Sequence, residues 1–478
     1  MKETKRTVRY FKFYDRRGIQ AYLEEMAEKG WLLTKCSDLF WHFKKIEPAK
    51  LHFSVVYFPQ ASMYEASASE NQLQFQEFCA HTGWKLAASN AQLQFFYNEA
   101  ETPVPIETDA VFEVENIHKS VKRQFLPGYY FELFLSVMLL TVLSIFCIRH
   151  PILFLPSGGF LVYLFCWTIV ALLSLTEITK YFSWYKKARR SAEEENSFEE
   201  PRNHPEHFVF ITPILLIGIG LYVSEKANGS FAFPLAFIIA GITLIYAFLV
   251  AFLFFGTIHL LKKMGTRPEI TKIGAFLASG LCGLLMLILL ICWVFEPLFD
   301  GRYQRSKESK IEYKYDNKSF YAYQDSLPFT VSDLIDTDYT AYSRRLSEKN
   351  SFLLSYLEAS ERPRVDALAE PRLSYRILKV KVPFLYDFCL KHMLEDFAHN
   401  FGRPVPEIPG WEQALSIDAA PWGANKAYRL FLDGEPQNRY LLCYDEAIVE
   451  INFDWEADEA NIEKIKQSLT SALTASKN

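Results

Sequence analysis

The sequence predicts an α+β protein that also contains transmembrane helices. Its parts are a ferredoxin-like N-terminal module built from a duplicated βαββ unit, a five-helix membrane bundle and a C-terminal α+β domain. Three observations lead to this prediction: long uncharged apolar runs occur only within 129–295, polar regions flank them, and a helix pattern ending in Gly-Trp occurs twice. The predicted boundaries are 1–118, 119–296 and 297–478.

The composition excludes two classes of protein. Of the 478 residues, 50% are hydrophobic and 16% are aromatic, which is too apolar for a disordered chain. The 51 basic and 56 acidic residues give a net charge of -5. This balance does not suit a protein that binds nucleic acid by neutralising phosphates. We therefore expect no nucleic-acid partner.

The N-terminal region repeats itself with a spacing of 53 residues. An alternating run at 6–13 precedes apolar residues at helical spacing between Ile19 and Lys29, and strand-like runs follow. The pattern then recurs, with a second helix at 70–81 and a strand at 92–97. The matching pairs include Tyr22 with Phe75, Glu24 with Glu77, Ala27 with Ala80, Leu33 with Leu86 and Phe43 with Phe96.

Both predicted helices end in the same dipeptide, Gly30-Trp31 in the first and Gly83-Trp84 in the second. Glycine adopts the left-handed conformation that closes a helix, and the apolar residue after it can fold back over the last turn. Neither unit alone covers two faces of a sheet, so we expect one antiparallel sheet with both helices on one side. The alternative is that Gly-Trp is only a helix end used twice.

These residues resemble a known family. The run FKFYDRRGIQAYLEEMAEKGWLLTK, the aromatic strand with Phe40, Trp41 and Phe43, and the run LHFSVVYF are similar to the bacterial domain-of-unknown-function family 2812. The resemblance covers roughly residues 5–100. Members of that family often join this cytoplasmic-looking module to a set of membrane spans, which implies the same for this chain. The family has no established activity, so the resemblance implies no functional residues.

The apolar region contains five segments of the length that crosses a bilayer as a helix, roughly 17 to 25 residues. Aromatic residues gather at several of their ends, as is typical of membrane interfaces. The third segment is the shortest. The expected spans are roughly 129–148, 160–178, 208–223, 235–255 and 273–295.

The Lys and Arg residues between these segments predict the orientation, because such residues stay on the cytoplasmic side. Thirteen lie on the side of the N-terminus, and the opposite loops hold Arg149 and Lys226. Counting Arg302, Arg305, Lys307 and Lys310, which follow the last segment, the comparison is thirteen against six. No signal-peptide pattern opens the chain. We expect a multi-pass protein of the cell membrane with a cytoplasmic N-terminus and an extracytoplasmic C-terminus.

The C-terminal region combines strand-like runs with two helical segments, which predicts an α+β domain. Cys389 and Cys443 are its only cysteines, and a disulfide between them stays open because an isolated pair is not a dense disulfide framework. Several tyrosines are either a binding face or one side of a sheet that packs on its core. They are Tyr313, Tyr315, Tyr321, Tyr323, Tyr339 and Tyr342.

The reaction motifs searched for are absent: there is no phosphate loop, nucleophile elbow, paired CxxC or HExxH. The best metal candidates lie at helical spacing on one face, namely His392, Glu395, Asp396 and His399. The stronger interpretation is a solvated helix face, because apolar residues define the opposite face. We expect no enzyme activity, no metal and no cofactor.

Small residues recur at intervals of four in the fifth expected span, at Ala275, Ser279 and Gly283. This spacing allows close contact between membrane helices or between copies of the chain. Alternatively, these small residues occur in a lipid-facing helix without any role in helix contact. Glu132, Glu177 and Glu296 lie near the ends of their segments, where we expect them to reach water.

Two function classes follow from these patterns. The first is a non-enzymatic sensing or regulatory membrane protein that links an extracytoplasmic binding domain to a cytoplasmic module. The second is an accessory subunit of a transport or envelope complex whose ATPase is a separate chain. Both imply a protein partner, either a regulator or a transporter subunit, and a homo-oligomer is compatible with both.

Overall fold

The computed structural model of the protein describes residues 3–9, 11–37, 40–65, 67–199, 249, 252–290, 310–398, 412–456 and 458–475. These residues divide into two compact α+β units. Unit 1 contains the described residues up to Leu139, those from Cys166 to 199 and those from 249 to 290. Unit 2 contains Leu140–Phe165 and the described residues from 310 onward.

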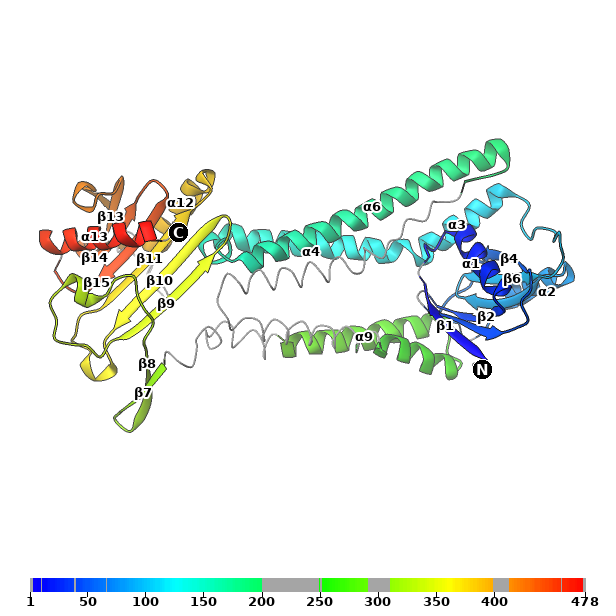
Figure 1. Cartoon of the computed structure of the whole chain (residues 1–478), viewed down its shortest axis with the longest axis horizontal. Helices are drawn as coiled ribbons and strands as arrows, with labels where there is room; N and C mark the ends of the chain where they lie inside the picture. Colours follow the sequence, from blue (N-terminus) through cyan, green and yellow to red (C-terminus); the bar gives the residue numbers. More distant parts are fainter. Residues whose placement is uncertain are drawn as a thin grey trace. The chain divides into compact units, whose positions relative to one another are not determined.

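The N-terminal part of unit 1 follows the order β-α-β-β twice (Figure 1). The first set is β1 (Thr4–Val8), α1 (Arg16–Glu28), β2 (Trp31–Cys36) and β3 (Phe40–Lys45). The second set is β4 (His52–Tyr57), α2 (Glu70–His81), β5 (Lys85–Asn90) and β6 (Leu93–Asn98). The Asp15 side chain caps α1 and the Ser69 side chain caps α2, each by accepting a backbone N–H of the first turn.

The strands form two antiparallel sheets with equivalent orders, β1-β3-β2 and β4-β6-β5. Each sheet has a bulge at the same place, between Leu33 and Lys35 in β2 and between Leu86 and Ala88 in β5. A bulge adds one unpaired residue and bends the strand. Its recurrence after 53 residues shows that the two sets share backbone geometry as well as sequence.

The single antiparallel sheet expected for this module is wrong. β2 and β5 contact each other, but among the described residues no ladder joins the two sheets. Val55 and Phe95 pack in the cluster that contains α1, whereas Val56 and Phe96 pack with Cys79 of α2. The two helices therefore cover opposite faces of the second sheet, because β4 and β6 carry apolar residues on both faces.

Three longer helices of unit 1 follow these sheets: α3 (Ala110–Gln124), α4 (Leu126–Arg149), whose last residues belong to unit 2, and α6 (Gly158–Glu195), which returns to unit 1. Asp109 caps α3 by accepting the backbone N–H groups of Val111 and Phe112. Only Phe125 separates α3 from α4. The core of the module includes buried residues from all three helices, namely Val114, Ile117, Val121, Leu126, Ile178, Tyr181, Ala188 and Ala192.

The five-helix membrane bundle expected from the sequence is wrong. Of the helices that the structure describes, α4 alone is long and apolar enough to cross a membrane. α6 contains the second expected span, but it continues into a charged segment whose buried side chains belong to the module core. The fifth expected span overlaps α9 (Pro268–Leu290). The third and most of the fourth lie outside the described residues.

Unit 2 contains an antiparallel sheet with the strand order β12-β13-β14-β15-β11-β10-β9. Its strands are β9 (Ser343–Asn350), β10 (Leu354–Arg362), β11 (Leu373–Val380), β12 (Glu412–Ile417), β13 (Lys426–Leu432), β14 (Glu435–Cys443) and β15 (Ala447–Phe453). The helices are α5 (Pro151–Phe154), α11 (Val331–Leu334), α12 (Tyr386–Ala398) and α13 (Glu459–Ala475). A separate hairpin joins β7 (Lys310–Tyr315) to β8 (Lys318–Tyr323).

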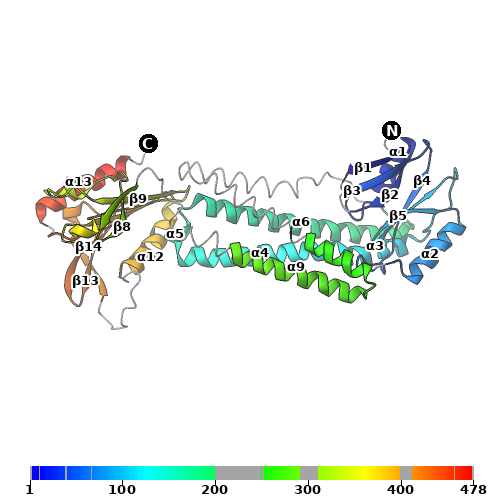
Figure 2. The same cartoon turned by 90° about the horizontal axis from the view of Figure 1, so that it is seen from below.

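α12 and α13 cover opposite faces of this sheet (Figure 2). Ile451 of β15 packs with Ile465 and Leu469 of α13, and Ile448 of the same strand packs with Met393 of α12. Successive side chains of a strand point to opposite faces. The alternation of apolar residues along β15 therefore builds two separate cores.

Candidate functional site

A cavity of about 530 Å³ lies in unit 1, where the ends of β2 and β5 meet the α3–α4 junction. Cavities of this size that combine apolar walls with a few polar groups are typical of small-molecule sites. The aromatic side chains that line it are Phe11, Phe13, Trp41, Phe95, Phe125 and Tyr129. The lining also includes the polar residues Lys12, Ser37, Asn90, Gln124 and Glu132.

The aromatic rings hold one another in place. The Trp41 ring lies edge-to-face against Phe11 at 5.5 Å and against Phe95 at 5.8 Å between centroids. The Trp41 indole N–H donates a hydrogen bond of 2.8 Å to the Arg9 carbonyl oxygen. The centroids of Phe125 and Tyr129 are 4.7 Å apart. These contacts fix the walls before any ligand binds, which reduces the entropy cost of binding.

A buried ion pair joins the loop after β1 to α6. The Lys12 Nζ atom lies 3.4 Å from the Glu177 Oε2 atom, and the two side chains are 7% and 4% exposed. Lys180 pairs with the other Glu177 oxygen at 3.0 Å. A buried charge is tolerated when it is paired. The expectation that Glu177 reaches water is therefore wrong, since its carboxylate is enclosed between α6 and the module.

Glu132 differs from Glu177. It lies in the second turn of α4, on the wall of the cavity, and within the described part of the chain its carboxylate has no hydrogen-bond or ion-pair partner. The neighbouring Lys12 is paired with Glu177, which it shares with Lys180. Glu132 is therefore a carboxylate on the cavity wall that no described residue pairs.

A cluster of rings lies between α3 and α6. The His118 Nδ1 atom is 2.7 Å from the Tyr181 hydroxyl oxygen, and its ring stacks on Tyr185 with centroids 3.9 Å apart. Tyr181 is fully buried and also contacts the Tyr14 ring at 5.3 Å. Burial lowers the pKa of the His118 imidazole, and the positive charge of Lys122 lowers it further. Protonation of the His118 imidazole would therefore affect the packing of α3 against α6.

Comparison with known proteins identifies this part of the chain. Residues 9–126 match the family described as Protein of unknown function (DUF2812). The match confirms the resemblance drawn from the sequence and extends it through α3 to the first residue of α4. No curated protein and no solved structure matches the chain. Most of the cavity lining belongs to the DUF2812 module, and Gly128, Tyr129 and Glu132 complete it from α4.

The repeated Gly-Trp ends of the DUF2812 module differ in their surroundings. Gly30 and Gly83 have φ angles of +79° and +87°, so both use the left-handed conformation. Trp84 is buried and its indole N–H donates to the Val104 carbonyl oxygen at 2.8 Å. Trp31 is half-buried, with the Lys5 ammonium 5.4 Å from its ring centroid. These residues are structural parts of the module and do not line the cavity.

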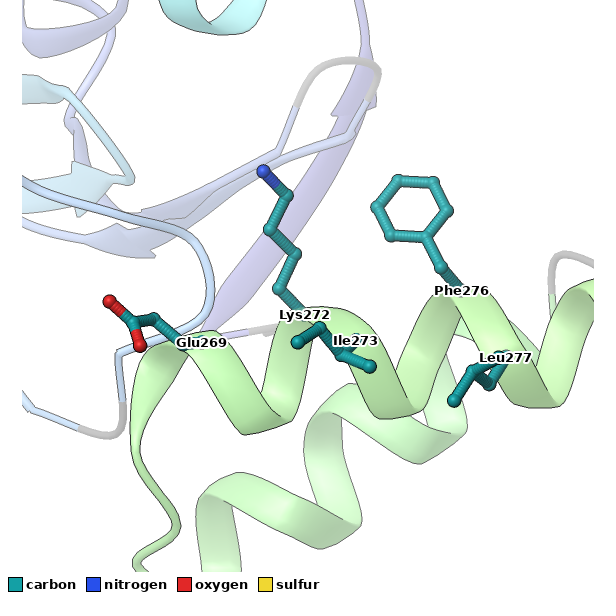
Figure 3. A pocket seen from close by; sticks show the side chains of 5 residues that line it. All are labelled: Glu269, Lys272, Ile273, Phe276 and Leu277. Carbon is teal, nitrogen blue, oxygen red and sulfur yellow. The ribbon is translucent and has the colours of Figure 1, made fainter.

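A second hollow lies beside α9 (Figure 3). It is lined by Glu269, Lys272, Ile273, Phe276 and Leu277, all from one helix. Ile273, Phe276 and Leu277 are 59%, 55% and 59% exposed. A single helical face does not enclose a ligand, so we assign no site there.

The small residues of α9 lie in a helix contact. Ala275 is fully buried and Ser279 is 8% exposed, and the Ser279 hydroxyl donates to the Ala275 carbonyl oxygen at 2.7 Å. A Cβ atom added at Gly274 would lie 2.8 Å from a methyl carbon of Leu261, in the helical segment 252–263. The surroundings of Gly283 are not among those that the structure describes. The close contact thus involves neighbouring helices of unit 1.

The candidate metal ligands of α12 do not form a metal site within the described residues. The His392 Nδ1 atom lies 2.9 Å from the Phe388 carbonyl oxygen, and Glu395 is exposed, 4.0 Å from Lys391. His399 lies outside the described residues. Burial raises the pKa of the Asp396 carboxyl, with Arg376 opposing the shift. Asp396 is half-buried, whereas Glu395 on the same helix face is exposed.

The charges near Asp396 belong to the sheet of unit 2. Glu450 accepts hydrogen bonds from Arg376 on the neighbouring strand and from Arg439 at 2.9 Å. The Arg439 guanidinium also lies 5.1 Å from the Phe397 ring centroid. A buried carboxylate held by two guanidinium groups is satisfied internally. We therefore interpret this network as a structural one.

The remaining candidates in unit 2 are also accounted for. Cys389 and Cys443 are both buried free thiols, so no disulfide joins them. Among the tyrosines considered as a binding face, Tyr323 and Tyr342 are buried and Tyr339 packs against the core, whereas Tyr315 and Tyr321 are exposed. The set therefore does not form one exposed face.

Lys12 and Glu132 were not singled out as site residues by the sequence reasoning. Lys12 looked like one of many basic residues near the N-terminus, and Glu132 looked like a carboxylate at a helix end. The available signal was the position of Lys12 between two phenylalanines in the run YFKFY. A lysine within an aromatic run has to find a buried partner if the run packs in a core.

Proposed function

We propose that this protein is a non-enzymatic regulatory protein of the cell membrane, in which the DUF2812 module senses a ligand and passes its state to α4 and α6. One observation carries this proposal. The buried cluster that holds the module together also contains residues of α3, of the first turn of α4 and of α6. A change at the cavity would therefore act directly on both long helices.

The exposure of α4 supports a membrane location. Its side chains are apolar around the whole helix, and Phe131, Phe134 and Ile148 are 65%, 65% and 60% exposed. A helix that is apolar on every side is normally buried in a large core or in a membrane. Within the described part of the chain these side chains stay exposed, so we propose that lipid covers them.

The charges before α4 support a cytoplasmic position for the module. Lys119, Lys122 and Arg123 precede the helix, and Arg149 is its last residue. Basic residues close to a membrane helix are retained on the cytoplasmic side. We propose a cytoplasmic N-terminus and an extracytoplasmic C-terminus. A reporter active only outside the membrane should give signal when fused at Asn478 and none when fused at Glu195, and the reverse result would contradict this orientation.

The test of the regulatory role is partner capture. The full chain, tagged and extracted from membranes in mild detergent, should retain a transcription regulator or a kinase. A matched variant with two glycines inserted between Phe125 and Leu126 should remain in the membrane and lose the effect of the module on that partner, because α3 no longer continues into α4. Recovery of an ATPase subunit would instead support the accessory role in transport.

A further inference from the structure

We propose that the cavity of the DUF2812 module binds a lipophilic organic cation, a molecule with one positive charge carried by aromatic or branched alkyl groups. This inference rests on the proposed function, because it names the ligand class of the same site. Three features of the site support it: the unpaired carboxylate on its wall, the chemistry of its aromatic rings and the placement of Glu132 in α4.

The charge of the wall favours a cation. Lys12 is paired with Glu177, which Lys180 also contacts, whereas the Glu132 carboxylate has no described partner. The other polar side chains of the lining are neutral: Ser37, Asn90 and Gln124. A ligand with one positive charge would pair with the Glu132 carboxylate, whereas an anion would be repelled by it.

The rings favour the same class of ligand. Six aromatic side chains line the cavity, and the face of an aromatic ring attracts a cation within about 6 Å of its centroid. Quaternary and other bulky cations are weakly hydrated, so transfer from water to an aromatic site costs them little. A small, strongly hydrated cation such as Na⁺ would lose more solvation than these walls return.

The placement of Glu132 is the third feature. α4 carries no other charged residue before Arg149, at its far end. A carboxylate within an apolar membrane helix is costly and marks a ligand or ion site more often than a structural one. Glu132, Tyr129 and Gly128 line the cavity from the first two turns of α4. A lipophilic cation concentrated at the membrane surface would meet these residues first.

The experiment uses two probes of the same size and shape and of opposite charge, tetraphenylphosphonium and tetraphenylborate. Binding to the full-length protein in detergent micelles is measured by equilibrium dialysis against empty micelles. We expect saturable binding of the phosphonium with affinity at least about tenfold above that of the borate. Hydrogen exchange should slow in the peptides that contain Trp41 and Phe125 when the phosphonium binds.

Three variants locate the effect. Glu132→Gln should weaken phosphonium binding at least about tenfold, and Glu132→Lys should reverse the preference toward the borate. Glu115→Gln is the matched control, because Glu115 is an exposed carboxylate of α3 paired with Lys119, and this variant should bind as the parent does. Each variant changes a side chain that no core contact requires.

Equal binding of the two probes, tighter binding of the borate, no saturable binding, or unchanged phosphonium binding by Glu132→Gln would each overturn the assignment. None of these results affects the outcome of the partner-capture test of the regulatory role. Conversely, capture of an ATPase subunit together with phosphonium binding that depends on Glu132 would contradict the regulatory role and leave the ligand class standing.

Discussion

The two tryptophans that follow Gly30 and Gly83 have the same position in the repeat and different environments. Trp84 is 4% exposed and its indole N–H is hydrogen-bonded to Val104. Trp31 lies half-buried under the Lys5 ammonium. Identical residues at equivalent positions therefore contribute differently to stability, because the burial of each depends on what packs above it.

Trp84→Ala should destabilise the second sheet by about 3 to 5 kcal/mol, as deletion of a large buried aromatic does, and Trp31→Ala should cost clearly less. The measurement is hydrogen exchange of β5 and β6, and of β2 and β3, in the full-length protein. Trp84→Phe, which loses mainly the hydrogen bond, should cost about 1 kcal/mol. Equal losses for the two alanine variants would contradict the difference in burial.

His118 should make the contact between α3 and α6 sensitive to acid. Its pKa is lowered from 6.5 by burial, so the unfolded form binds the proton more readily than the folded one. Stability is therefore constant above about pH 6.5 and falls as the pH drops below that value. Hydrogen exchange around Tyr181, corrected for its intrinsic pH dependence, should accelerate at pH 5 relative to pH 7.5.

His118→Phe is the control for this pH effect, since it keeps a ring against Tyr185 and removes the titrating group. Its α3–α6 contact should depend less on pH than that of the parent. The same pH dependence in both proteins would assign the effect to another group.

At the scale of elements, α4 is distinguished by the absence of a polar face. A soluble helix of this length would show one polar and one apolar side, whereas the side chains of α4 are apolar all round and several of them, including Phe131, Phe134 and Ile148, are exposed. The helix and its apolar surface therefore both come from the sequence of 126–149 itself.

Met138→Arg places a charge near the middle of α4 and should reduce membrane insertion of this helix by about 2.5 to 3.5 kcal/mol. The segment 126–149, placed in a host protein that reports insertion, should span the membrane in the parent form and in Met138→Leu. Equal insertion of the arginine variant would show that α4 lies on a protein surface or an interface instead.

The glycines that end α1 and α2 should also differ in their response to substitution. A side chain in the left-handed conformation costs about 1 to 2 kcal/mol. At Gly30 a Cβ atom would in addition lie 2.9 Å from the Ile46 carbonyl oxygen, whereas at Gly83 the nearest atom is the Asn98 side-chain nitrogen at 3.3 Å. The Ile46 carbonyl group, being backbone, can move away less easily than the Asn98 side chain.

We therefore expect Gly30→Ala to destabilise the module more than Gly83→Ala, with each costing at least about 1 kcal/mol. Gly128→Ala is the control, because nothing lies within 4 Å of its added Cβ atom. Thermal unfolding of the full-length variants measures the order, and a larger loss for Gly83→Ala would contradict the role of the Ile46 contact.

At the scale of the whole molecule, the Lys12–Glu177 pair joins parts of unit 1 that are 165 residues apart in the chain. Lys12→Met leaves the buried Glu177 carboxylate with Lys180 alone, whose side chain is 54% exposed, and should cost up to about 3 to 5 kcal/mol. The double variant Lys12→Met with Glu177→Met should recover most of this loss, because a buried pair can be replaced by apolar residues of similar volume.

The measurement is the unfolding of unit 1 in the full-length protein, in a double-mutant cycle. Lys12 and Glu177 are expected to be strongly coupled. Additive losses would show that water reaches the pair and that the α6 contact depends on the rings around Tyr14 alone.

The repeat, the helix ends and the family of the N-terminal module were all readable in the sequence. Gly30 and Gly83 are each followed by a tryptophan, and both have positive φ angles. The family match covers residues 9–126. These features are local: a glycine that ends a helix and an alternating strand depend on neighbours a few residues away, so one sequence determines them without knowledge of the fold.

Tertiary structure alone decided how the repeats combine and which charges matter. The sequence could not show that α1 and α2 cover opposite faces of one sheet, because Val55 and Val56 are both valines and only their partners differ. Nor could it separate Glu177 from Glu132. Both are carboxylates near the end of an apolar run, and only the fold places Lys12 beside the first and a cavity beside the second.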